Sequence, residues 1–478
     1  MSWDSDTDAE WAGPTKRKAA NSRSNHGGTV ETVSGTGKHK VKPAKLKVKL
    51  ANPAKLASGS GGCKRPAGSG KRGAGGTGTG TTDVTVTTSA VAVPLPPLPW
   101  RVPPSGCGQM IRLGTDFSGL ETPAQALEGL RVPFRHVFAT EIQSHLRHFI
   151  RKHFPVEERV YKDVQKRSVH KMLPVDLYVA GPPCQPWSKA GKMMGLEDMK
   201  GRGVLLFSTL EYISQHRPKV VVLENVATLA RPKFKANLEA LCQFLQENLG
   251  YEVHWAKIDT LDHGLPQARS RVYIVGFRLP GQLQAPFSFP EPLPHRLSIS
   301  KVLMHKNRPV TVRPATSETA LRNISKAQKE CPVFDKKPVF VDIDAGPKFA
   351  HWTVGHLPCL TASRGSTAGY YVSTLGRRLT VDEMMKFQGM SPSRLAGWEA
   401  VMKERQMGHA IGNAMSVNVL QRVLVRALLS SGLVPAGSVT DPWEDPKYTP
   451  WSAANCSPLP RHSGGSGMVC DDVFDDDV

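Results

Sequence analysis

The sequence has little of three things that mark other protein classes: paired cysteines, long apolar runs and, in its first hundred residues, aromatic side chains. Its eight cysteines include no CxxC pair, which argues against a zinc module and against a dense disulfide framework. The longest apolar runs, such as Val220 to Leu223, are far too short to cross a bilayer. The opening MSWDSDTDAEW has no charged stretch followed by an apolar one, so no secretory signal is visible. We therefore expect a soluble intracellular protein without a metal.

The chain is strongly basic. Lys and Arg number 62 against 41 Asp and Glu, which gives a net charge of +21 over 478 residues. This balance favours a polyanionic partner, with nucleic acid first, although charge alone does not separate DNA, RNA and an anionic membrane.

Residues 1–98 are rich in Gly, Ser, Thr, Ala and Lys, a composition that predicts a disordered basic tail. Within it, residues 38–55 place a cation at every second or third position, which suits contact with phosphates. The run KRK at 16–18 is a candidate nuclear import signal. We expect a nuclear location and contact with chromatin, and the alternative is a tail that only keeps the protein in solution.

From residue 108, short apolar runs alternate with helical patterns, which predicts an α/β domain with a parallel sheet. Strands are expected at 110–115, 136–140, 176–180, 219–223, 251–258 and 272–277. Helices are expected at 123–130, 142–153, 204–216, 234–248, 381–388 and 413–430. Thr122, followed by Pro123 and Gln125, predicts the cap of the first helix, and Thr380 with Glu383 predicts a capping box.

The pattern divides the chain into parts. We expect a first catalytic part over 108–279, a small, irregular inserted domain over 280–356 and a closing part over 357–432. Residues 436–478, rich in Pro, Ser and Gly and ending in DDVFDDDV, predict a disordered acidic tail.

Four of the predicted strands end in chemically interesting residues, at 116–119, 141, 181–184 and 224–226. Ligands of an open parallel sheet bind beyond these carboxyl ends. Each signal is weak alone, but Gly119 before a helix and Glu141 after the next strand together predict a nucleoside pocket.

Cys184 lies between two prolines that stiffen its approach and a basic, glycine-hinged loop, an arrangement that suits a nucleophile beneath a lid. A lone cysteine is more often a small buried apolar residue. Glu224, however, leaves a wholly apolar strand and should titrate high enough to share a proton. A thiolate and a protonatable carboxylate on one rim can perform covalent catalysis on an electron-poor ring.

The motifs DFSG, GPPCQPWS, ENV, QARSRVYIVG, GRRLTVDEMMKFQG and GNAMSVNV resemble, in this order, those of the cytosine-5 DNA methyltransferases. The resemblance covers about 110–278 and 356–425. It implies a Rossmann-like, S-adenosylmethionine-dependent methyltransferase fold, with 280–356 as a target-recognition region. It also implies a substrate of double-stranded DNA, and we expect a monomer.

The resemblance implies roles for individual residues. Cys184 would attack C6 of a flipped cytosine while Glu224 donates to N3, and Arg269 and Arg271, two apart on a strand, would hold the base O2. The implied cofactor-binding residues are Phe117, Gly119, Leu120, Glu141, Asp163, Pro183 and Asn413. The implied DNA contacts are Ser188, Lys189, Lys192 and Gln267.

Four residues depart from the family pattern or allow a second role. Asn413 could equally be a helix cap. Glu121 and Thr122 stand where the family usually has two glycines, and Ile142 stands where an aromatic residue often stacks on adenine.

Two other functions are alternatives to DNA methylation. The tRNA-modifying branch of the superfamily usually carries Cys-Phe-Thr after the ENV helix, and this chain has no such signature. A catalytically silent chromatin protein is the other rival, and the presence of Cys184, Glu224, Arg269 and Arg271 together argues against it.

Overall fold

The computed structural model describes residues 110–183, 205–281, 283–304 and 309–451. The predicted basic tail, Cys184 and the three predicted DNA contacts Ser188, Lys189 and Lys192 lie outside these residues. None of the helices in the described part is both long and apolar enough to span a membrane.

A seven-stranded sheet in the order β3-β2-β1-β4-β5-β7-β6 forms the centre of the fold. Its strands are β1 Ile111–Asp116, β2 Phe134–Thr140, β3 Arg159–Tyr161, β4 Leu177–Ala180, β5 Val220–Val226, β6 Tyr251–Asp259 and β7 Ser270–Arg278. Neighbours pair in parallel except at β7, which is antiparallel to both β5 and β6. All six predicted strands are present, and the Rossmann-like α/β class is confirmed. Strand β3 was missed because three residues with one buried side chain leave no pattern.

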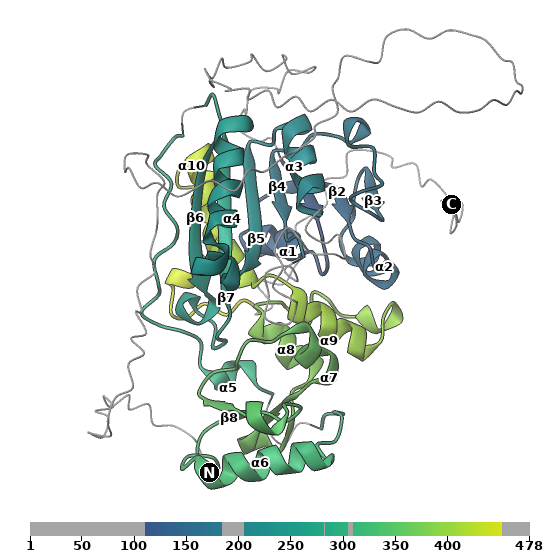
Figure 1. Cartoon of the computed structure of the whole chain (residues 1–478), viewed down its shortest axis with the longest axis vertical. Coiled ribbons are helices and arrows are strands. Elements are labelled where there is room, and N and C mark those ends of the chain that lie inside the picture. The colour runs from purple at the N-terminus through teal and green to yellow at the C-terminus, as the bar shows by residue number, and fades with distance from the viewer. Residues whose placement is uncertain (1–109, 184–204, 282, 305–308, 452–478) are drawn as a thin grey trace, which may run out of the picture. The chain divides into compact units, whose positions relative to one another are not determined.

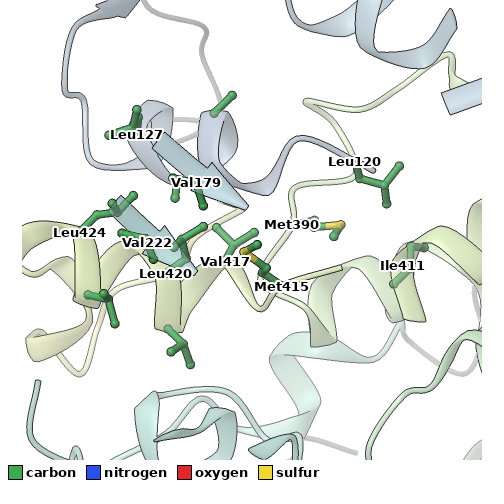
Figure 2. Packing of buried hydrophobic residues seen from close by; sticks show 14 of the residues in the cluster. Leu120, Leu127, Val179, Val222, Met390, Ile411, Met415, Val417, Leu420 and Leu424 are labelled. Atoms are coloured by element: carbon green, nitrogen blue, oxygen red, sulfur yellow. The ribbon is translucent and has the colours of Figure 1, made fainter. Parts of the chain in front are cut away.

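Helices cover both faces of this sheet (Figure 1). One face carries α1 Thr122–Gly129 and α10 Val417–Ser431, whose apolar side chains share one core with β1, β4, β5 and β7. Figure 2 shows part of this core, with side chains of α1 and α10 beside Val179 of β4 and Val222 of β5. The other face carries α3 Leu205–His216 and α4 Pro232–Gln243, which continues as a π-helical turn over Phe244–Asn248. Helix α2, Ser144–His153, lies beside β3. Short 3-10 turns occur at Val169–Lys171, Ala227–Ala230, Thr260–His263, Pro347–Phe349, Ser373–Leu375, Trp398–Ala400 and Pro442–Glu444.

The two predicted helix caps have different outcomes. The box at Thr380 and Glu383 is confirmed at the start of α8, Val381–Phe387: the Thr380 hydroxyl accepts from the Glu383 amide at 3.1 Å, and the Glu383 carboxylate accepts from the Thr380 amide at 2.9 Å. The cap at Thr122 is wrong, because α1 already begins there. Glu121 precedes the helix and caps nothing with its side chain.

The predicted helix at 413–430 is instead parts of two helices. Helix α9 runs over Glu404–Asn413, the extended Ala414 ends it, and α10 starts at Val417. Helix α9 crosses α7, Ala362–Thr367, with the two backbones almost in contact. A Cβ on Gly365 would lie 1.9 Å from the carbonyl oxygen of Gly408, so only glycine fits at this crossing.

A second sheet of four antiparallel strands, in the order β11-β10-β8-β9, forms a smaller part. Its strands are β8 Val339–Asp342, β9 Trp352–Val354, β10 Tyr370–Val372 and β11 Arg377–Arg378. Helix α6, Glu318–Glu330, packs on it, and the short α5, Ile299–Val302, precedes α6. The expectation of an irregular 280–356 region was wrong, since strands this short show no periodicity. The sheet also draws two of its strands from beyond residue 356.

The predicted disordered tail at 436–478 is wrong over residues 436–451, which pack against α10. Trp443 is 2% exposed, and its indole N–H donates to Gln421 at 2.7 Å. Asp441 pairs with the buried Arg422 at 2.6 Å. Residues 452–478 lie outside the described part of the chain.

Substituting Trp443 by alanine tests whether this segment belongs to the fold. We expect Trp443→Ala to lower the free energy of unfolding by about 3–5 kcal/mol, because it empties a packed site and leaves Gln421 unpaired. The substitution Glu444→Ala, at the next residue, removes only an exposed ion pair with Arg426. It should change the free energy of unfolding by no more than about 1 kcal/mol. Urea unfolding of both variants measures the difference, and equal, negligible effects would contradict this packing.

Candidate active site

A cavity of about 510 Å³ opens at the carboxyl ends of β1, β2, β4 and β5. This is the point between β1 and β4 where the strand order reverses, the usual ligand position in such sheets. The cavity wall brings together these predicted site residues: Phe117, Gly119, Leu120, Glu141, Asp163, Pro183, Glu224, Arg269, Arg271 and Asn413.

The turn after β1 forms one wall of the cavity. Phe117 and Gly119 both adopt left-handed backbone conformations, with φ of 56° and 53°. The amide of Gly119 donates to Glu141 Oε2 at 3.0 Å, and the amide of Gln143 donates to Glu141 Oε1 at 2.9 Å. Burial raises the pKa of Glu141, and these amide donors oppose the shift. Glu141 is thereby fixed against the turn.

A second turn, around Asp163, is held by a residue that the sequence did not reveal. Asp163 accepts from the amide of Gln165 at 2.9 Å. Arg167 follows two residues after Gln165. Its buried guanidinium forms a two-pronged ion pair with Asp116 and donates to the Thr140 hydroxyl at 2.6 Å. Tyr178 also donates to Asp116. Arg167 therefore joins this turn to the ends of β1 and β2 and to β4, and no local pattern could have indicated it.

Glu224 lies at the part of the cavity wall that also contains Gly181–Pro183 and Arg271. Its carboxylate is 3.1 Å from Arg271 Nε. Burial raises the pKa of Glu224, and the two nearby arginines only partly offset the rise. A Cβ placed on Gly181 would lie 3.7 Å from Glu224 Oε2, so the chain leading to Cys184 passes beside this carboxyl group. Asn225 strengthens the connection by donating to the carbonyl of Pro182 at 3.3 Å.

Arg269 and Arg271 do not share one role. Arg269 is 1% exposed and donates to three backbone carbonyls, of Leu360 at 2.8 Å, Gly412 at 3.3 Å and Ala414 at 2.6 Å. It ties the start of β7 to the segments around α7 and α9, and its expected contact with the base O2 stays a prediction. Arg271 lies on β7 against Glu224.

Cys359 was not identified from the sequence. Its sulfur lies 3.7 Å from Arg269 Nη1 and 3.9 Å from both Nη atoms of Arg271. Burial acts to raise the pKa of this thiol, but the two guanidinium groups outweigh it and lower the pKa. Beside Arg271, the chain therefore has a cysteine whose thiol loses its proton more readily than an ordinary one.

Gln267 does not fit the prediction of a DNA contact. Its side chain is fully buried, donates to the carbonyl of Phe387 at 2.7 Å and accepts from the amide of Leu360 at 3.1 Å. It joins the loop before β7 to α8 and to the segment before α7.

Asn413 is exposed at the end of α9, where its side-chain nitrogen lies 3.4 Å from Nδ1 of His409. It caps no helix start, and it lines the cavity. Within the described ranges, no cluster of His, Cys, Asp and Glu could hold a metal ion.

Comparison with known proteins gives one consistent family. The family model described as C-5 cytosine-specific DNA methylase matches residues 115–428. The type II methyltransferase M.NgoBI of Neisseria gonorrhoeae is 31% identical over 303 residues, covering 61% of this chain and 87% of that protein. M.HaeII of Haemophilus aegyptius is 29% identical over 62% of this chain and 88% of its own length. Among solved structures, the methyltransferase EhMeth of Entamoeba histolytica aligns with a TM-score of 0.48 and 18% identity, over 68% of this chain and 100% of that one.

Glutamine substitutions separate the two arginines. We expect Arg269→Gln to lower the free energy of unfolding by about 2–4 kcal/mol, because three buried carbonyls lose their donor. Arg271→Gln should affect stability less, since Glu224 can take up a proton once its cation is gone, but it should reduce methyl transfer more. Urea unfolding and transfer assays on both variants check this, and equal losses of stability would contradict the assignment.

Proposed function

Because the chain belongs to the C-5 cytosine-specific DNA methylase family, we propose that it methylates a cytosine flipped out of double-stranded DNA through a covalent bond between Cys184 and C6. Family membership makes the chain a DNA cytosine-5-methyltransferase whose methyl donor is S-adenosylmethionine. The single observation that carries the proposed mechanism is the buried Glu224 carboxyl group, beside both Arg271 and the Gly181–Pro183 approach to Cys184.

The cavity suits S-adenosylmethionine. The Phe117–Leu120 turn, with Gly119 in a left-handed conformation, lets the backbone approach a ligand closely. Glu141 and Asp163 offer carboxylate oxygens to ribose hydroxyls and to the adenine amine, and the exposed Ile142 offers an apolar contact at the rim. When bound there, S-adenosylmethionine supplies an electrophilic methyl group.

The proposed chemistry starts with the thiolate of Cys184 adding to C6 of the cytosine ring. Burial raises the pKa of Glu224, which favours transfer of a proton from its carboxyl group to N3, so that N3 takes up the electron pair that the addition of the thiolate pushes into the ring. Arg271, next to Glu224, stabilises developing charge on O2. C5 becomes nucleophilic and takes the methyl group. Solvent water takes up the C5 proton, the C5–C6 double bond re-forms as the thiolate leaves, and N3 returns its proton to Glu224.

The reacting carbon is hidden within the DNA duplex, so the target cytosine has to leave the helix, and protein contacts must offset the cost of unstacking it. Ser188, Lys189 and Lys192 remain the predicted phosphate contacts for this step. A nuclear location and chromatin contact also stay predictions, supported only by the Lys-rich segments at 16–18 and 38–55.

Trapping the covalent intermediate is the sharpest test, because Cys359 offers a rival nucleophile. A duplex containing 5-fluorocytosine cannot lose fluorine from C5, so the thioether to C6 persists after methyl transfer. We expect wild type and Cys359→Ala to form a denaturant-resistant protein–DNA adduct, and Cys184→Ala to form none. Peptide mass spectrometry of the adduct locates the bond.

The same three proteins, assayed with labelled S-adenosylmethionine, test the substrate. Label should enter duplex DNA with wild type and not with Cys184→Ala. An adduct that disappears in Cys359→Ala would overturn the nucleophile, and label that enters only tRNA would overturn the substrate.

A further inference from the structure

Glu121, directly before α1, is in an unusual position for a glutamate. It is completely buried and adopts a left-handed backbone conformation with φ of 53°. Residues other than glycine rarely adopt this conformation. A strained and buried charged residue type at this point needs a compensating interaction.

The Glu121 carboxyl group belongs to a buried polar network behind the cavity wall. Its Oε1 accepts from the Thr115 hydroxyl at 2.8 Å and lies 3.6 Å from His136 Nε2. The Thr115 hydroxyl is 2.8 Å from that of Ser118, which in turn accepts from the amide of Thr140 at 3.1 Å. The network thus joins β1, the turn after it, and β2.

The surroundings of Glu121 favour an uncharged carboxyl group. Its Oε2 and His136 Nδ1 are both buried without a hydrogen-bond partner. Within the described residues, His136 is the one basic side chain within ion-pairing distance of Glu121, while Asp116 and Glu141 add negative charge nearby. A carboxylate left there would be very costly. Burial accordingly raises the pKa of Glu121 to about 8 and lowers that of His136 to about 3, so both are neutral near pH 7.

We propose that Glu121 is a positioning residue for the cofactor: its neutral carboxyl group holds the turn at 116–121 in the conformation that lines the cavity, and its ionisation disrupts that turn. Phe117, Ser118, Gly119 and Leu120 of this turn all line the cavity. The Gly119 amide also fixes Glu141, so a disturbed turn releases the ribose-side acid as well. The inference rests on the proposed placement of S-adenosylmethionine in this cavity.

Cofactor affinity as a function of pH is the direct test. Calorimetry would give the dissociation constants of S-adenosylmethionine and S-adenosylhomocysteine between pH 6.5 and 9.5 for wild type and Glu121→Gln. Titration of the ligand cancels in the ratio of the two proteins, because glutamine keeps the shape and neutrality of the protonated acid. We expect the ratio of the wild-type dissociation constant to that of the variant to be constant below pH 8. Above pH 8 this ratio should rise by about tenfold per pH unit, because wild type binds more weakly.

Stability adds a readout that needs no ligand. The folded state keeps the Glu121 proton up to about pH 8, whereas the unfolded chain loses it near the ordinary glutamate pKa of 4.5. Relative to Glu121→Gln, wild type should therefore lose stability as pH rises from 4.5 to about 8, and then lose no more. Glu247→Gln, an exposed change elsewhere, should show neither trend.

Glu121→Gly separates the carboxyl group from the backbone strain. It relieves the strain but removes the hydrogen bond to Thr115, so we expect binding about fivefold weaker than wild type at pH 7, the equivalent of one hydrogen bond. Equal pH profiles for wild type and Glu121→Gln, or tighter binding by Glu121→Gly, would overturn the inference. A wild-type protein that binds neither ligand at any pH would instead overturn the proposed cofactor site.

Discussion

The ion pair between Asp116 and Arg167 is the interaction on which the cofactor half of the site depends. Both side chains are essentially inaccessible to water, and the pair is completed by hydrogen bonds from Tyr178 to Asp116 and from Arg167 to Thr140. These hydrogen bonds offset part of the cost of burying the pair, and removing one partner would leave an uncompensated charge. The pair thus fixes the strand ends of β1 and β2 and the Asp163 turn as one unit.

The catalytic half depends on a comparable arrangement around β7. Arg269 donates hydrogen bonds to carbonyls of the segments around α7 and α9. These bonds anchor the later parts of the chain to the sheet. With that anchor in place, Arg271 lies between Glu224 and Cys359. One cation thereby sits between two groups that can each carry negative charge, and the charge on either influences the proton affinity of the other.

Much of this organisation could be predicted from the sequence, because polar side chains of the site directly follow apolar strands. Glu141 and Glu224 each follow an apolar run, and parallel strands bring such ends to one edge. Asn413 was placed on the cavity by resemblance alone, and its helix was misjudged because the extended Ala414 has no sequence signature. The buried backbone partners of Gln267 and Arg269 were not anticipated, because a motif identifies residues without showing which way they face. Arg167 and Cys359 could not be identified from the sequence, because their partners lie far away in the chain. The partner of Arg167 is Asp116, and those of Cys359 are Arg269 and Arg271.

The environments of three carboxyl groups around one cavity explain why they do not behave alike. Glu141 accepts two backbone amides, which stabilise a negative charge despite its burial. Glu224 has a guanidinium on one side and an apolar strand behind it, so its proton is held but can be shared. Glu121 has hydroxyl groups and a neutral imidazole, and therefore keeps its proton. Under the proposed mechanism, three glutamates serve as hydrogen-bond acceptor, proton donor and neutral structural support, because their distances to amides and cations differ although all three are buried.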